Sequence, residues 1–481
     1  MISYGDGKTT YSDGDSLSGD LGEKVRKGDK EALQKLKEFA ENKDPEQPHS
    51  QARALYELGE VYFNGFCEVK RSAKKALEYF TKAAQLNDAL ALIRLGEYYR
   101  DGKQGFNQDG QKALEYFLKA TKFDKPNGYE FAAKMYRMGK GVKADGYKAI
   151  EFYEKLDALD NKRAAFNIAQ IYEDGCGRLK ANGYKALEIY DDIIAQGKYW
   201  VKIHRDFGIK SPKLENYKEA LNNAARIYLE GKTGVRPDGY KAIEYFSELT
   251  EYDDMEVIRE IAEIYLEGKA GVTPDGFKAI GYFTRLADND DMEAVKEIAE
   301  IYLEGKAGVE PDAFKAIEYF NEIIQRNDIN ESFANPSNAL QAIAQIYLEG
   351  KAGVEPDGLK AIEYFNKIIQ RNDPNELFDH TSNTLHAIAE IYRYGKGGVP
   401  QDGNKAVEYY SKLAENKDSS DFSSYAPDDA FYELGNIYEE GCGSVAPDMQ
   451  KAIEFYQKSA TLGNYFAKMK LKELVGSDND E

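Results

Sequence analysis

One stretch of about twenty residues is written four times along this chain and limits what the chain can fold into. Residues 346–365 read IYLEGKAGVEPDGLKAIEYF, and close copies occupy residues 301–320, 264–283 and 227–246. The tyrosine of its Tyr-x-x-Gly step is a first marker, and it recurs as Tyr62, Tyr99, Tyr136, Tyr172, Tyr228, Tyr265, Tyr302, Tyr347, Tyr392 and Tyr438. A second marker, Lys-Ala and then an aromatic pair, follows, as in Lys75-Ala76 with Tyr79-Phe80. Units this small have no core of their own, so they must stack.

Each half of the unit is predicted to be a helix. Ile258, Ile261, Ala262 and Tyr265 recur at i, i+3, i+4 and i+7, which is one stripe of a 3.6-residue period. Gly268 stands where a helix ends with positive φ. In the second half, Ala279, Phe283, Leu286 and Ala287 form a similar stripe, and Asp275 is its expected N-cap. The unit is therefore a helix–turn–helix of about 36 residues.

The order of residues in the unit resembles the Sel-one-like repeat family, a short-period relative of the tetratricopeptide repeats. The residues that carry the resemblance in the last unit are Leu434-Gly435, Tyr438, Gly441, Gly443, Val445, Asp448, Lys451-Ala452 and Phe455-Tyr456. The chain departs from the family pattern in two ways. It has Tyr or Phe where the family often has Trp, and its central units replace Leu-Gly by Ile-Ala, as at Ile261-Ala262. The resemblance implies a superhelical scaffold that presents a concave surface to protein or peptide partners.

We therefore expect an all-α, right-handed superhelical solenoid of about ten helix–turn–helix repeats and about twenty-two helices. Residues 1–28 are expected to be a polar N-terminal tail, residues 29–475 the solenoid, and residues 476–481 an acidic C-terminal tail. A longer step between Tyr172 and Tyr228 predicts an insertion at about residues 195–223. Half-units that read KEALQKLKEFAEN and YFAKMKLKELV are expected to cap the two ends.

Composition and missing motifs exclude several functions. The chain has 64 basic and 84 acidic residues, a formal net charge of −20, which argues against a nucleic-acid binder. Its four histidines show no metal-binding spacing, and the carboxylates cannot be sorted into an acid/base pair. We thus expect no enzyme, no catalytic residue, no cofactor and no metal. The absence of a signal peptide and of long apolar runs predicts a cytoplasmic protein without membrane insertion, with secretion by a route without a cleaved signal left open.

Candidate binding residues are those that stacking does not require. Six glutamates share one face of two successive first helices: Glu260, Glu263 and Glu267, then Glu297, Glu300 and Glu304. Acidic residues at a helix C-terminus are unfavourable with the dipole, so a lysine two positions on, an inter-repeat pair or a basic ligand must offset them. A solvated face with local salt bridges is the alternative.

The insertion supplies two more candidates, Trp200 and His204, in a locally basic segment. Insertions in solenoids often contact partners. A lengthened helix pair with Trp200 packed against its neighbours is the alternative.

Two functions are compatible with these observations. The first is a non-enzymatic scaffold or adaptor whose concave face binds a protein or peptide, in particular one with a basic segment. The second is a bacterial secretion-linked protein, either a host-directed effector or a binding partner of a toxin. The sequence names neither the partner nor the oligomeric state.

Overall fold

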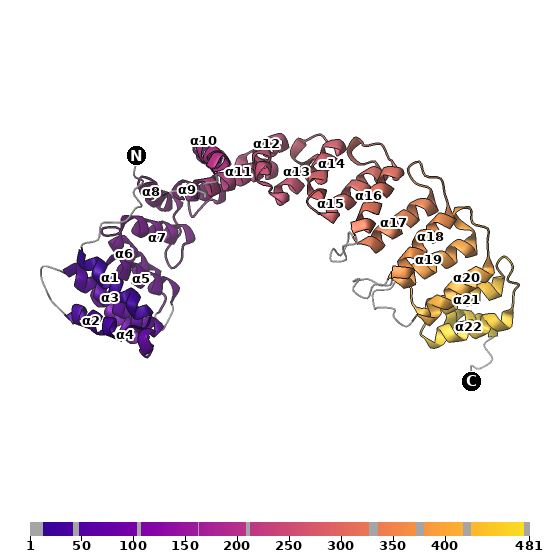
Figure 1. Ribbon diagram of the computed structural model, residues 1–481, viewed down its shortest axis with the longest axis horizontal. Coiled ribbons are helices and arrows are strands. Elements are labelled where there is room, and N and C mark those ends of the chain that lie inside the picture. The colour runs from indigo at the N-terminus through magenta and orange to yellow at the C-terminus, as the bar shows by residue number, and fades with distance from the viewer. Residues whose placement is uncertain are drawn as a thin grey trace. The chain divides into compact units, whose positions relative to one another are not determined.

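The chain folds into a succession of α-helices, as the computed structural model shows (Figure 1). The structure describes residues 13–41, 48–102, 107–161, 163–207, 212–326, 335–371, 380–416 and 425–475. These residues contain no β-strand, only two isolated bridges, Cys176–Leu179 and Cys442–Val445. The helices are α1 (Asp13–Arg26), α2 (Lys30–Glu41), α3 (Pro48–Asn64), α4 (Ala73–Gln85), α5 (Ala89–Asp101), α6 (Gly110–Ala120), α7 (Lys125–Met138), α8 (Gly146–Asp157), α9 (Ala164–Asp174), α10 (Gly183–Phe207), α11 (Pro212–Glu230), α12 (Gly239–Leu249), α13 (Met255–Glu267), α14 (Gly276–Ala287), α15 (Met292–Glu304), α16 (Ala313–Arg326), α17 (Pro336–Glu349), α18 (Gly358–Arg371), α19 (His380–Tyr394), α20 (Gly403–Glu415), α21 (Pro427–Glu440), α22 (Met449–Thr461) and α23 (Tyr465–Val475).

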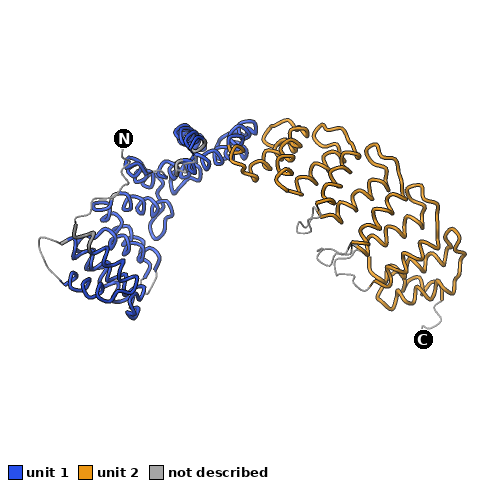
Figure 2. The backbone as a smooth tube through the Cα atoms, viewed as in Figure 1, with its two compact units in different colours: residues 1–248 blue, residues 249–481 orange. Residues whose placement is uncertain are grey.

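The predicted all-α solenoid of helix–turn–helix repeats is confirmed. The chain divides into two compact units, residues 1–248 and residues 249–481 (Figure 2). From α3 on, an odd-numbered helix and the next even-numbered helix form the two halves of a repeat, here called helix A and helix B. Within each unit, helix B packs against its own helix A and against helix A of the next repeat. Each repeat thus buries its apolar stripe only with its neighbours.

The turn between helix A and helix B is closed by the residues that the sequence singled out. Gly268 ends α13 at φ 72° and donates its backbone N–H to Ile264 O over 2.9 Å. Asp275 begins α14, and its side chain accepts from the Lys278 N–H over 3.0 Å. The Asp275 N–H also donates to the carbonyl of the marker Tyr265 over 2.8 Å. The glycine, the acid and the tyrosine therefore belong to one turn.

The second marker packs against the first. The Tyr265 ring stacks on Tyr282 with centroids 6.1 Å apart, and Lys278 Nζ lies 4.8 Å from the Tyr265 centroid. The same lysine–tyrosine contact occurs in all ten repeats, at Lys75–Tyr62, Lys112–Tyr99, Lys148–Tyr136, Lys185–Tyr172, Lys241–Tyr228, Lys278–Tyr265, Lys315–Tyr302, Lys360–Tyr347, Lys405–Tyr392 and Lys451–Tyr438. The second aromatic of the pair, Phe283 in α14, is buried in the core. The repeated residues are therefore architectural.

One difference from the expected domain boundaries concerns the N-terminus. Residues 13–26, which we expected in a polar tail, form α1. Although this segment is largely polar, one face of it is apolar. Leu21 and Val25 are buried there, and α1 packs against both α2 and α3. Helices α1 and α2 thus form a pair ahead of the first marker tyrosine, and Gly28, at φ 97°, ends the turn after α1. The rest of the proposed division stays a prediction, and residues 1–12 and 476–481 lie outside the described residues.

The insertion at residues 195–223 lengthens two helices. Helix α10 has 25 residues and α11 has 19, and they pack against each other. Gly197 of α10 lets the Tyr217 ring of α11 approach closely. The insertion therefore forms the lengthened helix pair that the sequence analysis gave as one alternative.

Candidate interaction surface

The six candidate glutamates lie on helix A of two successive repeats in residues 249–481. Glu260, Glu263 and Glu267 are on α13, and Glu297, Glu300 and Glu304 occupy the same positions on α15. We call these six residues the acidic surface. Glu267 and Glu304 are exposed, and the other four are partly buried. The predicted spacing therefore places each trio on one face of its helix.

Local lysines offset part of this charge. Lys269 Nζ lies 3.1 Å from Glu263 Oε2 and 3.3 Å from Glu267 Oε2. On α15, Lys306 Nζ lies 3.2 Å from Glu304 and 3.7 Å from Glu300. The lysine two positions after the last acid of helix A is therefore one answer to the unfavourable helix dipole, and the pair recurs as Glu230–Lys232 and Glu349–Lys351.

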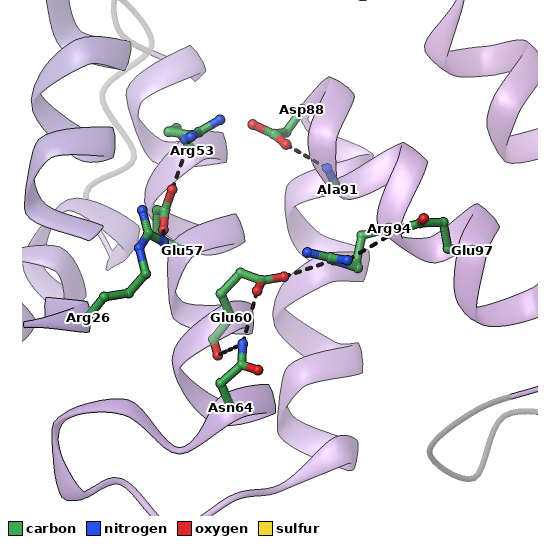
Figure 3. A network of polar contacts seen from close by, with 9 residues as sticks. All are labelled: Arg26, Arg53, Glu57, Glu60, Asn64, Asp88, Ala91, Arg94 and Glu97. Carbon is green, nitrogen blue, oxygen red and sulfur yellow. Dashed lines mark hydrogen bonds and ion pairs between the residues drawn. The ribbon is translucent and has the colours of Figure 1, made fainter. Parts of the chain in front are cut away.

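In the N-terminal repeat, arginines rather than lysines pair with the glutamates at the corresponding positions (Figure 3). Glu57 and Glu60 of α3 stand where Glu260 and Glu263 stand on α13. Arg26 Nη1 of α1 lies 2.7 Å from Glu57 Oε2, and Arg94 Nε of α5 lies 2.9 Å from Glu60 Oε1. Glu57 is only 2% exposed, so its carboxylate is held in the fold by guanidinium groups from Arg26 and from Arg53 of its own helix. Arginines from neighbouring helices thus complete this face.

Some ion pairs between successive repeats join two positions that the sequence analysis did not single out. In these pairs, the residue after the first marker of one repeat contacts the residue five positions before the first marker of the next. Arg393 pairs with Glu433 in this way, and Glu439 pairs with Lys470 Nζ over 2.9 Å. A charged residue after the marker tyrosine was the available signal, but its partner lies about one repeat away in sequence.

Glu297 has no charged residue at the matching position. The residue one repeat earlier at the matching position is Leu266 rather than an arginine. Within the described residues, Glu297 makes no ion pair shorter than 4.0 Å. Burial, with repulsion from Glu300 as the next cause, raises the pKa of the Glu297 carboxyl. The acidic surface thus contains a partly buried carboxylate without an arginine counterpart.

We expect Glu297→Gln to stabilise the protein at neutral pH. The pKa of Glu297 is higher in the folded chain than in the unfolded chain, so its ionisation costs folding free energy as pH rises through that folded pKa. Below the ordinary glutamate pKa, the residue is protonated in both states and the gain disappears. Thermal unfolding at pH 7 and pH 4 measures this. Glu304→Gln, at an exposed residue paired with Lys306, is the control and should give no gain at pH 7; equal gains would contradict the assignment.

Trp200 and His204 lie on α10, in the other compact unit. Trp200 is partly buried, and its ring meets Tyr199 edge-to-face with centroids 5.6 Å apart. The His204 side chain lies outside the described part of the structure. A pocket lies beside α10, and it is lined by residues including Asp191, Lys198 and Tyr245. The Tyr245 hydroxyl donates to Asp191 over 2.7 Å, so part of its polar lining is already paired.

The described residues contain no group of histidine, cysteine and carboxylate side chains that could hold a metal ion. None of the described helices is both long enough and apolar enough to cross a membrane.

The fold defines the chain as an all-α helical-repeat protein. Its sequence matches the Sel1 repeat ten times, over residues 52–88, 89–122, 128–156, 162–191, 218–250, 258–291, 293–328, 337–373, 383–418 and 429–464. The chain belongs to the Sel1 repeat family, the Sel-one-like repeats that its sequence resembles. Proteins of this family generally mediate protein–protein interactions and are typically non-catalytic scaffolds.

Solved structures with a similar fold include two bacterial proteins. One is a protective antigen of uropathogenic Escherichia coli with an SLR fold, 22% identical, covering 92% of this chain and 90% of its own, with a TM-score of 0.33. The other is a Sel1 repeat protein from Oxalobacter formigenes, 19% identical, covering 78% of this chain and 95% of its own, with a TM-score of 0.41. No protein of curated function matches the chain. At these identities and TM-scores, neither structure bears on what this chain binds.

Proposed function

We propose that this protein is a non-enzymatic scaffold or adaptor whose acidic surface binds a basic segment of a partner protein. The observation that carries the proposal is the contrast between repeats. Glu57 pairs with Arg26 and Glu60 with Arg94 from neighbouring helices. At the same two positions on α15, Glu297 has no arginine at the matching position of the preceding repeat, and Glu300 pairs with lysines only among its described ion pairs. A partner's arginine or lysine would supply that charge. The concave position of this face remains part of the proposal.

Charge balance supports this assignment. Five carboxylates of the acidic surface, Glu263, Glu267, Glu297, Glu300 and Glu304, have three lysines among their described ion-pair partners, Lys269, Lys296 and Lys306. An excess of negative charge therefore remains on it. Exposed ion pairs contribute only about 0.2–1 kcal/mol each, so the carboxylates would act together rather than singly. Electrostatic complementarity of this kind mainly accelerates association and selects partners.

Charge reversal at Glu263, Glu267, Glu300 and Glu304 tests the proposal. We expect the variant with lysine at all four positions to associate at least about tenfold more slowly with the partner, because repulsion replaces attraction. Parent and variant serve as parallel baits in extract of the native cell. Proteins retained by the parent alone are then purified, and their association rates are measured at two salt concentrations. Binding by the parent should weaken as salt rises.

A matched control reverses the same number of charges elsewhere in the same unit. Glu310, Glu318, Glu355 and Glu363 are exposed and lie outside the acidic surface. Their reversal should leave binding close to that of the parent. A partner that binds both variants equally, or that binds the parent independently of salt, would contradict the proposal. The acidic surface would then be a solvated face with local salt bridges to its lysines.

The alternative of a secretion-linked protein also stays a prediction. No observation on the described residues favours it over the scaffold. A secretion apparatus or toxin gene beside this gene would support it.

A further inference from the structure

The last helix, α23, is helix A of a repeat whose helix B is missing from the described part of the chain. Its Ala467 takes the place of Ala430 in α21, and both side chains are fully buried. Its Lys470 pairs with Glu439 over 2.9 Å, at the two positions through which Glu433 and Arg393 pair between complete repeats. Helix α23 therefore packs against α22 and contacts α21 through Tyr432–Phe466 and Glu439–Lys470, as a further repeat would.

In complete repeats, the outer face of helix A is covered by helix B. On α21, Tyr432 and Gly435 lie against the Tyr456 ring of α22, and Tyr438 stacks on Phe455 with centroids 5.5 Å apart. The residues at these three positions on α23 are Met469, Lys472 and Val475.

That face of α23 is uncovered and largely apolar. Tyr465 is 66% exposed, Met469 51% and Val475 58%, although side chains of this kind are usually buried. The opposite end differs, because the described residues of α1 and α2 include no large hydrophobic side chain that is exposed.

We propose that the outer face of α23, formed by Tyr465, Met469, Lys472 and Val475, binds an acidic amphipathic helix of a partner protein at the position that helix B occupies in complete repeats. The repeats themselves show that a helix fits on this face. The positive charges on α23 indicate what kind of helix binds there. Lys472 stands where Gly435 receives the Tyr456 ring, so an acidic side chain, rather than an aromatic ring, is complementary there. Lys468 adds a second exposed positive charge beside the apolar stripe.

Two other occupants fit less well. Residues 476–481, GSDNDE, contain no large apolar side chain that would match the stripe. A second copy that docked through its own α23 would bring Lys468 and Lys472 against the same lysines, which is unfavourable. One short helix also forms a small interface, for which weak, micromolar binding is the expectation.

The test uses a labelled peptide with the sequence of residues 448–464, in which Tyr456→Glu places a carboxylate opposite Lys472. Fluorescence anisotropy with the full chain should give saturable, micromolar binding. The same peptide with Tyr456→Lys should bind at least about tenfold more weakly. In the protein, Lys472→Glu should reverse this preference, because the charge that selects the peptide is reversed.

The Met469→Asp variant should lose binding of the glutamate peptide, while its melting temperature stays that of the parent because Met469 is exposed. Three results would overturn the proposal: no saturable binding of the glutamate peptide to the parent, no reversal with Lys472→Glu, or full binding by Met469→Asp. Sedimentation of the parent at rising concentration tests whether the protein forms a dimer through this face. A dimer that Met469→Asp abolishes would assign the face to a second copy instead.

Discussion

Replacing Gly268 by valine is expected to destabilise the protein by about 3 kcal/mol or more. Gly268 ends α13 at φ 72°, a conformation that a β-branched residue adopts only with strain. A Cβ at this position would also lie 2.8 Å from Pro274 Cγ and 2.9 Å from the Val272 carbonyl oxygen. Both contacts are within the turn that joins α13 to α14, so the strain cannot be relieved without moving a helix. Thermal and denaturant unfolding measure the loss.

The same turn provides a control with the opposite sign. Ala270 has φ 51° and ψ 38°, and Ala307 has nearly the same angles in the next repeat. Gly397 stands at the equivalent position further along the chain, at φ 61°. We expect Ala270→Gly to be neutral or stabilising by up to about 1 kcal/mol, because glycine enters this region without the Cβ penalty. If Gly268→Val unfolds like the parent, that glycine is not a required helix cap.

The second large effect is expected from Phe283→Ala, at about 3–5 kcal/mol. Phe283 is 1% exposed, and its ring lies in the core between α13, α14 and α15. In a solenoid, each repeat is stabilised only by its neighbours, so a cavity in one repeat weakens the coupling across it. We therefore expect the denaturant transition to become broader or to separate into two steps, as followed by circular dichroism.

Phe277 is the matched control because it lies on the same helix and is 63% exposed. Phe277→Ala removes the same side chain from solvent-facing surface and should change the free energy of unfolding by less than about 0.5 kcal/mol. Equal losses for the two variants would show that burial in the repeat core is not what makes the aromatic pair indispensable.

Local signals explain why the helices and turns could be predicted. The stripe of α13, the glycine that ends it and the aspartate that begins α14 all lie within one repeat. Each acts through contacts a few residues away, such as the 3.0 Å bond from Lys278 N–H to Asp275. Helix α1 was missed because its sequence, DGDSLSGDLGEKVR, is poor in helix formers and apolar residues. It is helical because α2 and α3 bury Leu21 and Val25.

For the candidate surface, too, some properties could be predicted from local spacing and others could not. Helical spacing was enough to place Glu260, Glu263 and Glu267 on one face, because neighbours three and four positions apart share a face of any α-helix. Spacing could not tell which carboxylates have counterions. The Arg26–Glu57 and Arg393–Glu433 pairs join residues about one repeat apart, and only stacking brings them together.

By itself, then, the sequence determined the repeat, its helices, its turns and its family, because those properties arise from periodicity and from short-range hydrogen bonds. Only the tertiary structure decided which side chains remain unmatched. The partly buried Glu297 without an arginine and the uncovered face of α23 both depend on what the neighbouring repeat does or does not supply. Burial and ion pairing are properties of two stacked helices, and neither helix encodes them alone.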